Sequence, residues 1–463
     1  SYVSMENARR NLDAEVGTRD FDSVREAAKA KWNEALGRIR VEGGTEEERT
    51  IFYTALYHSL LHPNIVSDIN GEYPAMESGA TGVAAGYDRY TVFSLWDTYR
   101  NVHQLLTLAY PEVQTDMIRS MVAMSQEWGW LPRWELYGRE TFTMEGDPAI
   151  PVIVDSYLKG LRDFDINAAY EAMKRSATTE GKHNAIRPDI DPYIERGYIP
   201  VGLFAQDMSG DNSVSHALEY YVADNALATF AHEMGDEEFA REMERRAAGW
   251  RNYYSKADGA MRPIGMDGNY VGEFDPAAGA NFSNTIGFHE GSSWNYTFFV
   301  PHDIEGLMKA MGGSKRFVEK LQWVFDNGHY DPTNEPDIAY PYLFSRVRGE
   351  EWRTQRIVRE LLNANYTTTP DGLPGNDDTG TMSTWAVFSM LGIYPDCPGE
   401  PYYTITTPRF ERAEIDTQHG TIVIVTKGEG DYIKDIRLGG KCSGYRISHA
   451  DLVKAKELKL KLK

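Results

Sequence analysis

Four segments of the chain join carboxylates and amides to aromatic residues in a way that helix packing does not require. The first opens a helix at Ser94 and carries Trp96, Asp97 and Arg100. Trp96 can offer an apolar platform to the face of a sugar, and Asp97 can accept hydrogen bonds from two adjacent hydroxyl groups. Capping by Ser94 and an ion pair between Asp97 and Arg100 would explain the same residues, so both interpretations stay open at this point.

The second segment places Glu290 between His289 and Gly291, beside Trp294 and Tyr296. Burial next to aromatic rings disfavours the charged form of a carboxylate, and the resulting rise in pKa is what a general acid needs. A carboxylate that favours the start of a helix is the plain alternative.

The third segment crowds Asn334, Glu335 and Asp337 in front of a helix. Oxygen ligands of this kind suit a hard cation such as calcium better than zinc, although a helix-capping cluster would use the same residue types. The fourth contains the adjacent pair Asp377 and Asp378 between glycines. Like charges repel and one aspartate would cap as well as two, so the functional interpretation is strongest here.

The remaining motifs narrow the class of reaction. The sequence has no His-Glu-x-x-His pair, no phosphate-binding Gly-x-x-x-x-Gly-Lys and no Gly-x-Ser-x-Gly elbow, which argues against zincins, nucleotide hydrolases and common serine hydrolases. Carboxylates and tryptophans on loops suit glycoside cleavage. In that reaction one carboxyl group protonates the leaving oxygen, and another activates water or attacks carbon.

Composition sets further limits. A chain of 463 residues with 41% apolar residues can bury a large core. Its net charge of −21 repels phosphate backbones and anionic headgroups, so we expect neither nucleic acid nor a membrane surface as a partner. No apolar run reaches the roughly 20 residues of a membrane span. The two cysteines, Cys397 and Cys442, could form one disulfide, but the sequence does not decide this.

Apolar residues recur at three- and four-residue spacings along most of the chain, which predicts about a dozen amphipathic helices. The predicted helices cover about 21–39, 45–60, 94–109, 112–127, 149–162, 166–177, 213–234, 237–255, 298–311, 314–326, 338–346, 351–364 and 380–392. Long polar loops separate some of them, notably 137–148, 187–211 and 261–294. No repeat of roughly 30–45 residues is present, which favours a closed double ring of helices over an open solenoid.

From about residue 401 the pattern changes to β-branched residues, at 421–425 and 433–438, which predicts strands. The last ten residues alternate leucine and lysine. They fit an edge strand whose charges block aggregation, or an artificial extension. The expected architecture is therefore a large helical body with a small β appendage.

At these segments the sequence resembles glycoside hydrolase family 92, the calcium-dependent exo-acting α-mannosidases. The similarity runs from Ser1 to about Pro408 and continues more weakly through the terminal strands. Its most specific motifs are Ser94-Leu95-Trp96-Asp97-Thr98-Tyr99-Arg100, Glu290-Gly291 with Trp294 and Tyr296, Asn334-Glu335-Pro336, and Gly375-Asn376-Asp377-Asp378 with Gly380, Met382, Ser383 and Trp385.

The resemblance implies an inverting enzyme that removes terminal α-linked mannose from a glycan. Glu290 would be the general acid, and Asp377 or Asp378 the general base. Glu335 and Asn295 would hold a calcium ion that grips two neighbouring hydroxyls, with Asn334 and Asp337 behind them. Residues expected to bind the sugar are Trp96, Asp97, Arg100, Trp294, Asn334 and Glu335.

The resemblance also implies an (α/α)6 six-hairpin toroid over residues 21–400. Residues 1–20 would be the last strand and linker of an N-terminal β-sandwich, and 401–463 the C-terminal strands. Relatives are mostly exported, so a secreted or periplasmic location is expected. Where relatives carry a His-His pair after Asn-Glu-Pro, this chain has Asp337-Ile338-Ala339. Where α-1,2-specific relatives carry histidine it has Asn334, so we expect no α-1,2 preference.

Two alternatives remain at the level of function. One is cleavage of a mannosyl-phosphate linkage, which scarcely needs an acid, so the presence of Glu290 argues against it. The other is a carbohydrate-binding relative without turnover, because part of the pocket in relatives comes from the N-terminal sandwich.

Overall fold

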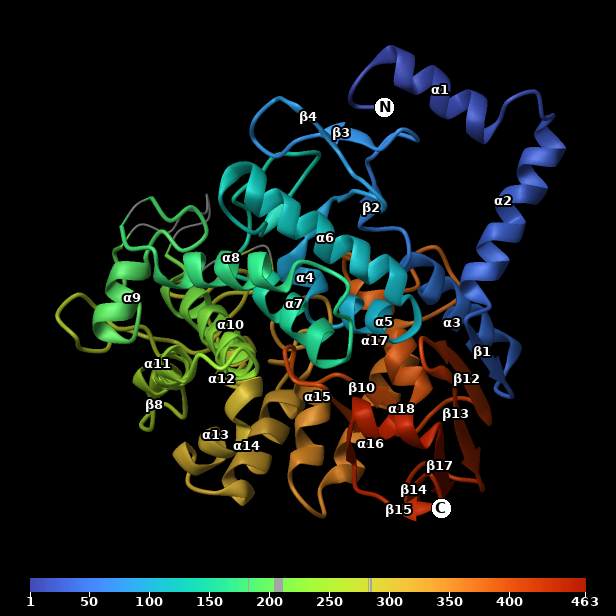
Figure 1. The fold of residues 1–463 in the computed structure, drawn as a ribbon. Helices are drawn as coiled ribbons and strands as arrows, with labels where there is room; N and C mark the ends of the chain where they lie inside the picture. The colour runs from blue at the N-terminus through green and yellow to red at the C-terminus, as the bar shows by residue number, and fades with distance from the viewer. Residues whose placement is uncertain (182, 204–210, 282, 284) are drawn as a thin grey trace.

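Helices are the main regular structure of the molecule, and the longer strands gather near its C-terminal end (Figure 1). The structure is a computed structural model that describes residues 1–181, 183–203, 211–281, 283 and 285–463. Its helices are α1 (Met5–Glu15), α2 (Phe21–Leu36), α3 (Glu46–His58), α4 (Leu95–Thr98), α5 (Val102–Ala109), α6 (Pro111–Trp128), α7 (Ala149–Leu158), α8 (Ile166–Thr178), α9 (Ile190–Arg196), α10 (Ser213–Glu233), α11 (Glu237–Ala247), α12 (Ser293–Thr297), α13 (Ile304–Ala310), α14 (Ser314–Asp326), α15 (Tyr340–Leu343), α16 (Glu351–Asn365), α17 (Thr381–Leu391) and α18 (His449–Ala455), with 3-10 turns η1 (Ala248–Asn252), η2 (Pro301–Asp303) and η3 (Phe344–Arg346).

The strands are short in the helical body and longer after residue 401. They are β1 (Ile39–Glu42), β2 (Asn64–Ile65), β3 (Glu72–Pro74), β4 (Thr81–Val83), β5 (Tyr90–Thr91), β6 (Phe93–Ser94), β7 (Trp134–Glu135), β8 (Tyr254–Ser255), β9 (Ala260–Met261), β10 (Ile393–Tyr394), β11 (Tyr402–Ile405), β12 (Arg412–Thr417), β13 (Gly420–Lys427), β14 (Ile433–Leu438), β15 (Lys441–Cys442), β16 (Arg446–Ser448) and β17 (Glu457–Leu462). The mainly helical class and the C-terminal strands are as the sequence predicts.

Two kinds of helix build the body. Nearly every residue of α5, α7, α10 and α17 is buried, so these helices are enclosed on all sides. Helices such as α8 and α16 bury one face only, and they pack against α10 and α17 respectively. This explains why strongly periodic patterns and nearly continuous apolar runs both appear in the sequence. Among the described residues no helix is both long and apolar enough to cross a lipid bilayer.

Local chemistry accounts for several helix boundaries. Thr45 and Glu48 form a reciprocal capping box at the start of α3. The helix predicted over 94–109 is divided into α4 and α5 at Asn101, whose φ of −158° is not helical. The loop predicted over 187–211 contains α9, which the sequence analysis missed, while 204–210 lie outside the described residues.

The N-terminal prediction of a strand within residues 1–20 is wrong, because residues 5–15 form α1. This segment has no β-branched residue, and Ser4 caps it by accepting from the amide of Asn7. The side chain of Asn7 also donates to Asp68 at 2.8 Å. In Figure 1, α1 and α2 extend away from the other helices, and no residue of α2 is buried.

The C-terminal sheet has six strands in the order β1-β12-β13-β17-β14-β15. The expectation that the leucine–lysine segment is an edge strand is wrong. β17 is paired in parallel with β13 and antiparallel with β14, because its buried leucines Leu458 and Leu460 complete the apolar face between them. β1, far earlier in the chain, supplies one edge. Cys397 is buried and Cys442 exposed, and no disulfide joins them.

Candidate active site

The four segments singled out in the sequence meet at one place. The carboxyl group of Asp97 is repelled by those of Asp378 and Glu290, and that of Glu335 by Asp97 and Asp378. The side-chain amide of Asn334 donates to the backbone carbonyl of Glu290 at 2.8 Å. Residues up to about 280 positions apart in sequence therefore form a single acidic cluster.

Asp97 lies in α4, where the pairing of β6 with β7 fixes the preceding backbone. It is buried and accepts a hydrogen bond from the hydroxyl of Ser94. Burial raises the pKa of Asp97 well above its usual range, and repulsion from Asp378 adds to this. Keeping the Asp97 carboxyl group charged therefore costs free energy, unless a positive group or a further hydroxyl group contacts it.

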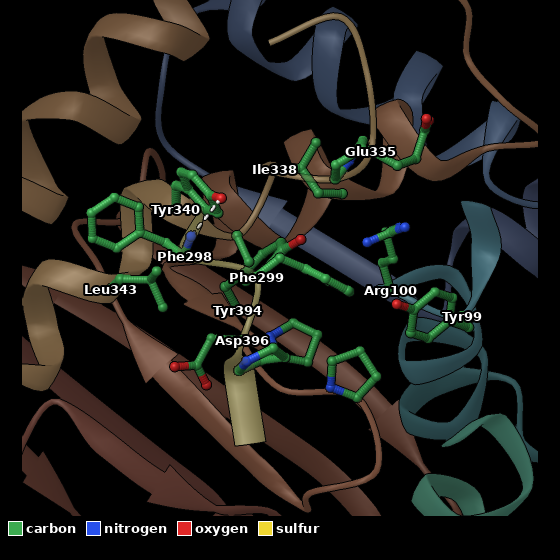
Figure 2. Close-up of a pocket in the computed structure, with 15 residues that line it drawn as sticks. Tyr99, Arg100, Phe298, Phe299, Glu335, Ile338, Tyr340, Leu343, Tyr394 and Asp396 are labelled. Atoms are coloured by element: carbon green, nitrogen blue, oxygen red, sulfur yellow. Dashed lines mark hydrogen bonds between the residues drawn. The ribbon is translucent and has the colours of Figure 1, made fainter. Parts of the chain in front are cut away.

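Glu335 is fully buried, and no amide, hydroxyl or guanidinium donor among the described residues reaches either of its carboxylate oxygens. Its pKa is raised well above the usual range by burial first, and then by Asp97 and Asp378. Behind it lies a pocket of about 30 Å³ with a mainly apolar lining, in which Figure 2 shows Arg100 directed towards Glu335. The apolar surroundings explain the high cost of charge at Glu335.

Arg100 was expected to contact substrate, but its side chain is engaged inside the protein. It makes an ion pair with Glu219 at 2.7 Å and lies over the ring of Trp96, and Glu219 also accepts from the hydroxyl of Tyr99 at 2.5 Å. The positive charge of Arg100 lowers the pKa of Asp97 and Glu335 against the larger effect of burial. Arg100 thus supports the acidic cluster from within.

Glu290 has a φ of +43°, a left-handed conformation that is unfavourable for a residue with a Cβ atom. The backbone on each side of it is fixed. Tyr296 donates its hydroxyl to the carbonyl of His289 at 2.7 Å, and a Cβ atom at Gly291 would lie 3.2 Å from the Tyr296 ring. Strained backbone held by its surroundings is common at functional sites.

The two adjacent aspartates have different environments. Asp377 accepts from the backbone amide of Ser383 at 2.9 Å and so caps α17. Asp378, with φ +43°, interacts instead with Glu335. Burial raises the pKa of both carboxyl groups. The loop that carries them packs tightly on the third segment, because a Cβ atom at Gly375 would lie 2.6 Å from the carbonyl of Thr333.

Three predicted site residues are engaged in packing or structural bonds. Trp96 is 1% exposed between Arg100 and His289, and Trp294 is 5% exposed against Trp323, so neither presents an open platform. The side-chain oxygen of Asn295 accepts from Ser292, and its amide donates to Asp337 at 2.8 Å. Both polar atoms of the Asn295 side chain are therefore engaged in hydrogen bonds within the protein.

The structure also reveals residues that the sequence analysis missed. Glu219 lies in the middle of the apolar helix α10, yet it anchors Arg100 and Tyr99. A charged residue within an otherwise apolar helical run was the signal available in the sequence. Glu145 accepts from Ser215, whose hydroxyl in turn accepts from the amide of His289.

The family model for the glycosyl hydrolase family 92 catalytic domain matches residues 7–463. The chain belongs to glycosyl hydrolase family 92. An α-mannosidase of this family from Bacteroides thetaiotaomicron superposes with a TM-score of 0.90 at 30% identity, covering 100% of this chain and 61% of that one. The same α-mannosidase in complex with mannoimidazole gives 0.92, at 30% identity and with 62% of its chain covered.

Other relatives agree with this assignment. An inverting mannosidase of family 92 from the same bacterium has a TM-score of 0.91 at 29% identity, with 100% of this chain and 65% of that chain covered. An uncharacterized secreted glycosidase of Arthroderma benhamiae is 28% identical over 95% of this chain and 57% of its own length. The family 92 chain thus spans about three fifths of the length of these relatives.

Proposed function

We propose that this chain is the catalytic part of an exo-acting α-mannosidase that hydrolyses terminal α-mannosides with inversion. The observation that carries the proposal is the convergence of Glu290 and Asp378, which are partly exposed, with the buried Asp97 in one acidic cluster. Glycoside hydrolysis needs opposed carboxyl groups of this kind. The relatives named above as mannosidases support mannose, in a mannose-containing glycan, as the sugar.

In this mechanism Glu290 donates its carboxyl proton to the glycosidic oxygen as the bond to the anomeric carbon breaks. The pair of Asp377 and Asp378 accepts a proton from the water that attacks that carbon from the opposite face. Inversion requires the acid and base carboxyls to be about 6.5–9.5 Å apart, which leaves room for the water. Burial raises the pKa of both aspartates, which strengthens them as bases.

We propose calcium as the cofactor, with Glu335 as its protein ligand. The carboxylate of Glu335 is buried, no amide, hydroxyl or guanidinium donor of the described residues reaches it, and its nearest polar partner is another carboxyl group, so it fits a hard cation. Among the described residues no preformed group of three or more acidic, histidine or cysteine side chains has metal-binding geometry, so sugar hydroxyls and water would complete the shell. When bound, the ion polarises two adjacent sugar hydroxyls. Asn295 then orients Asp337 instead of binding the ion.

The same proposal covers the architecture and the location. We propose that the helices of residues 21–400 form the (α/α)6 toroid, with 401–463 as a C-terminal β unit that recruits β1. Enclosed helices such as α10 covered by one-sided helices such as α11 support two concentric layers. Secretion is proposed because a relative is named as a secreted glycosidase.

The decisive experiment measures hydrolysis of α-mannosides with good and poor leaving groups, with the anomer of the product followed by NMR. We expect β-mannose as the first product and loss of activity with a chelator. Glu290→Gln should lower kcat/KM for poor leaving groups by about 10²–10⁴-fold and far less for activated aryl mannosides. Equal losses on both substrates would remove Glu290 from the acid role. Binding of mannosides without turnover would instead indicate the non-catalytic relative.

A further inference from the structure

The loop that holds Glu290 is fixed by contacts from three separate parts of the chain. The amide of His289 donates to Ser215 of α10, and the carbonyl of His289 accepts from Tyr296 of α12. The next carbonyl, that of Glu290, accepts from Asn334 at 2.8 Å. This last contact comes from the loop that also carries Glu335.

Asn334 is 3% exposed, and its amide group is directed at the backbone of Glu290. A left-handed φ of +43° turns the carbonyl of Glu290 away from the direction it would take in extended or helical backbone. A donor placed on this carbonyl therefore favours the strained conformation over the relaxed ones. Direct bonding of the Asn334 amide to a sugar would compete with this contact.

We propose that Asn334 is a positioning residue for the general acid, an inference that rests on the proposed function. Its amide holds the Glu290 backbone in the left-handed conformation, and so sets the direction from which the carboxyl group reaches the glycosidic oxygen. Because Asn334 and Glu335 are neighbours in one loop, the group that grips the sugar and the group that protonates the leaving oxygen are placed by the same short segment.

The test compares Asn334→Ala with Asn281→Ala on α-mannosides of good and poor leaving groups. Asn281 is a matched control, because its amide donates to the carbonyl of Thr333 at 3.2 Å and so supports the same loop through a different backbone group. We expect Asn334→Ala to lower kcat for poor leaving groups by about tenfold or more, and to change kcat for activated substrates by less than about threefold. The larger loss is a part of what removal of the general acid itself would cause. Asn281→Ala should affect both substrates alike.

A double variant separates positioning from general damage. Once Glu290→Gln has removed proton donation, adding Asn334→Ala should cause little further loss on poor leaving groups. If the loss in the double variant equals the product of the two single losses, the inference is overturned. A raised KM with unchanged kcat in Asn334→Ala would also overturn it, because Asn334 would then be a sugar contact. If Asn334→Ala does not fold, Asn334→Asp takes its place, because aspartate keeps the shape of asparagine and removes the amide donor. The deciding quantity is again the loss of kcat on poor leaving groups relative to the loss on activated substrates. A wild-type chain that cleaves no activated mannoside would instead refute the proposed function.

Discussion

Single residues in the acidic cluster serve function at a cost in stability. Burial and neighbouring carboxyl groups raise the pKa values of Asp97 and Glu335, and burial raises that of Asp378, while these groups gain little from the protein in return. Arg100, bound to Glu219, offsets only part of this repulsion. Such an arrangement is expected where a charged or polyhydroxylated ligand completes the site.

The two adjacent aspartates should differ in their effect on stability. Asp377→Ala removes the cap on α17 and should lower the free energy of unfolding by about 0.5–2 kcal/mol. Asp378→Asn keeps a residue that tolerates a left-handed φ and removes a carboxyl group that repels Glu335, so the melting temperature should rise. Thermal unfolding of both variants tests this contrast. Normal turnover in both Asp377→Ala and Asp378→Asn would end the assignment of the base to this pair.

Among the secondary-structure elements, short strand pairs matter more than long ones for positioning the residues of the acidic cluster. β6 and β7 are only two residues each, yet they set the start of α4 and therefore Asp97. The buried carboxylate of Glu135 in β7 accepts from the amide of Val92, whose φ of +64° is rare for a β-branched residue. Glu135 also accepts from Gly138 at 2.6 Å.

The pH dependence of this pairing can be measured. Burial raises the pKa of Glu135 from 4.5 to about 7, so the folded state holds its proton more tightly than the unfolded state does. This contribution to stability is present below pH 4.5 and is lost as pH rises through about 7, a change of about 3 kcal/mol. Glu135→Gln should remove that part of the dependence in urea unfolding at pH 5 and pH 8, and an unchanged dependence would contradict the assignment.

The whole molecule is acidic, with a net charge of −21, and concentrates buried carboxyls where its distant loops meet. A divalent cation bound there should therefore stabilise the folded chain. At a calcium concentration 100 times its dissociation constant the gain is about 2.7 kcal/mol, seen as a higher melting temperature. Glu335→Gln should abolish the shift, and sodium chloride of equal ionic strength should not reproduce it. A shift of the same size in Glu335→Gln would remove Glu335 from the metal shell.

Much of the secondary structure follows from the sequence, because periodic burial and local caps act over a few residues. Thr45 with Glu48 marks the start of α3, and the β-branched run at 421–425 lies in β13. The errors arise where distant partners decide. β17 is an inner strand because β13 and β14 flank it. The ion pair between Arg100 and Glu219 likewise joins residues too far apart in sequence for a local pattern to show.

By itself the sequence determined the mainly helical class, the four chemical segments and the family, because these depend on local periodicity and on the identity of short motifs. Tertiary structure alone decided that Asp97, Glu290, Glu335 and Asp378 meet. It also decided which side-chain amides are already engaged in hydrogen bonds within the protein. Asn295 and Asn334 look equally available in the sequence, yet each is bonded inside the site. Contacts across hundreds of residues depend on packing geometry, which no local pattern encodes.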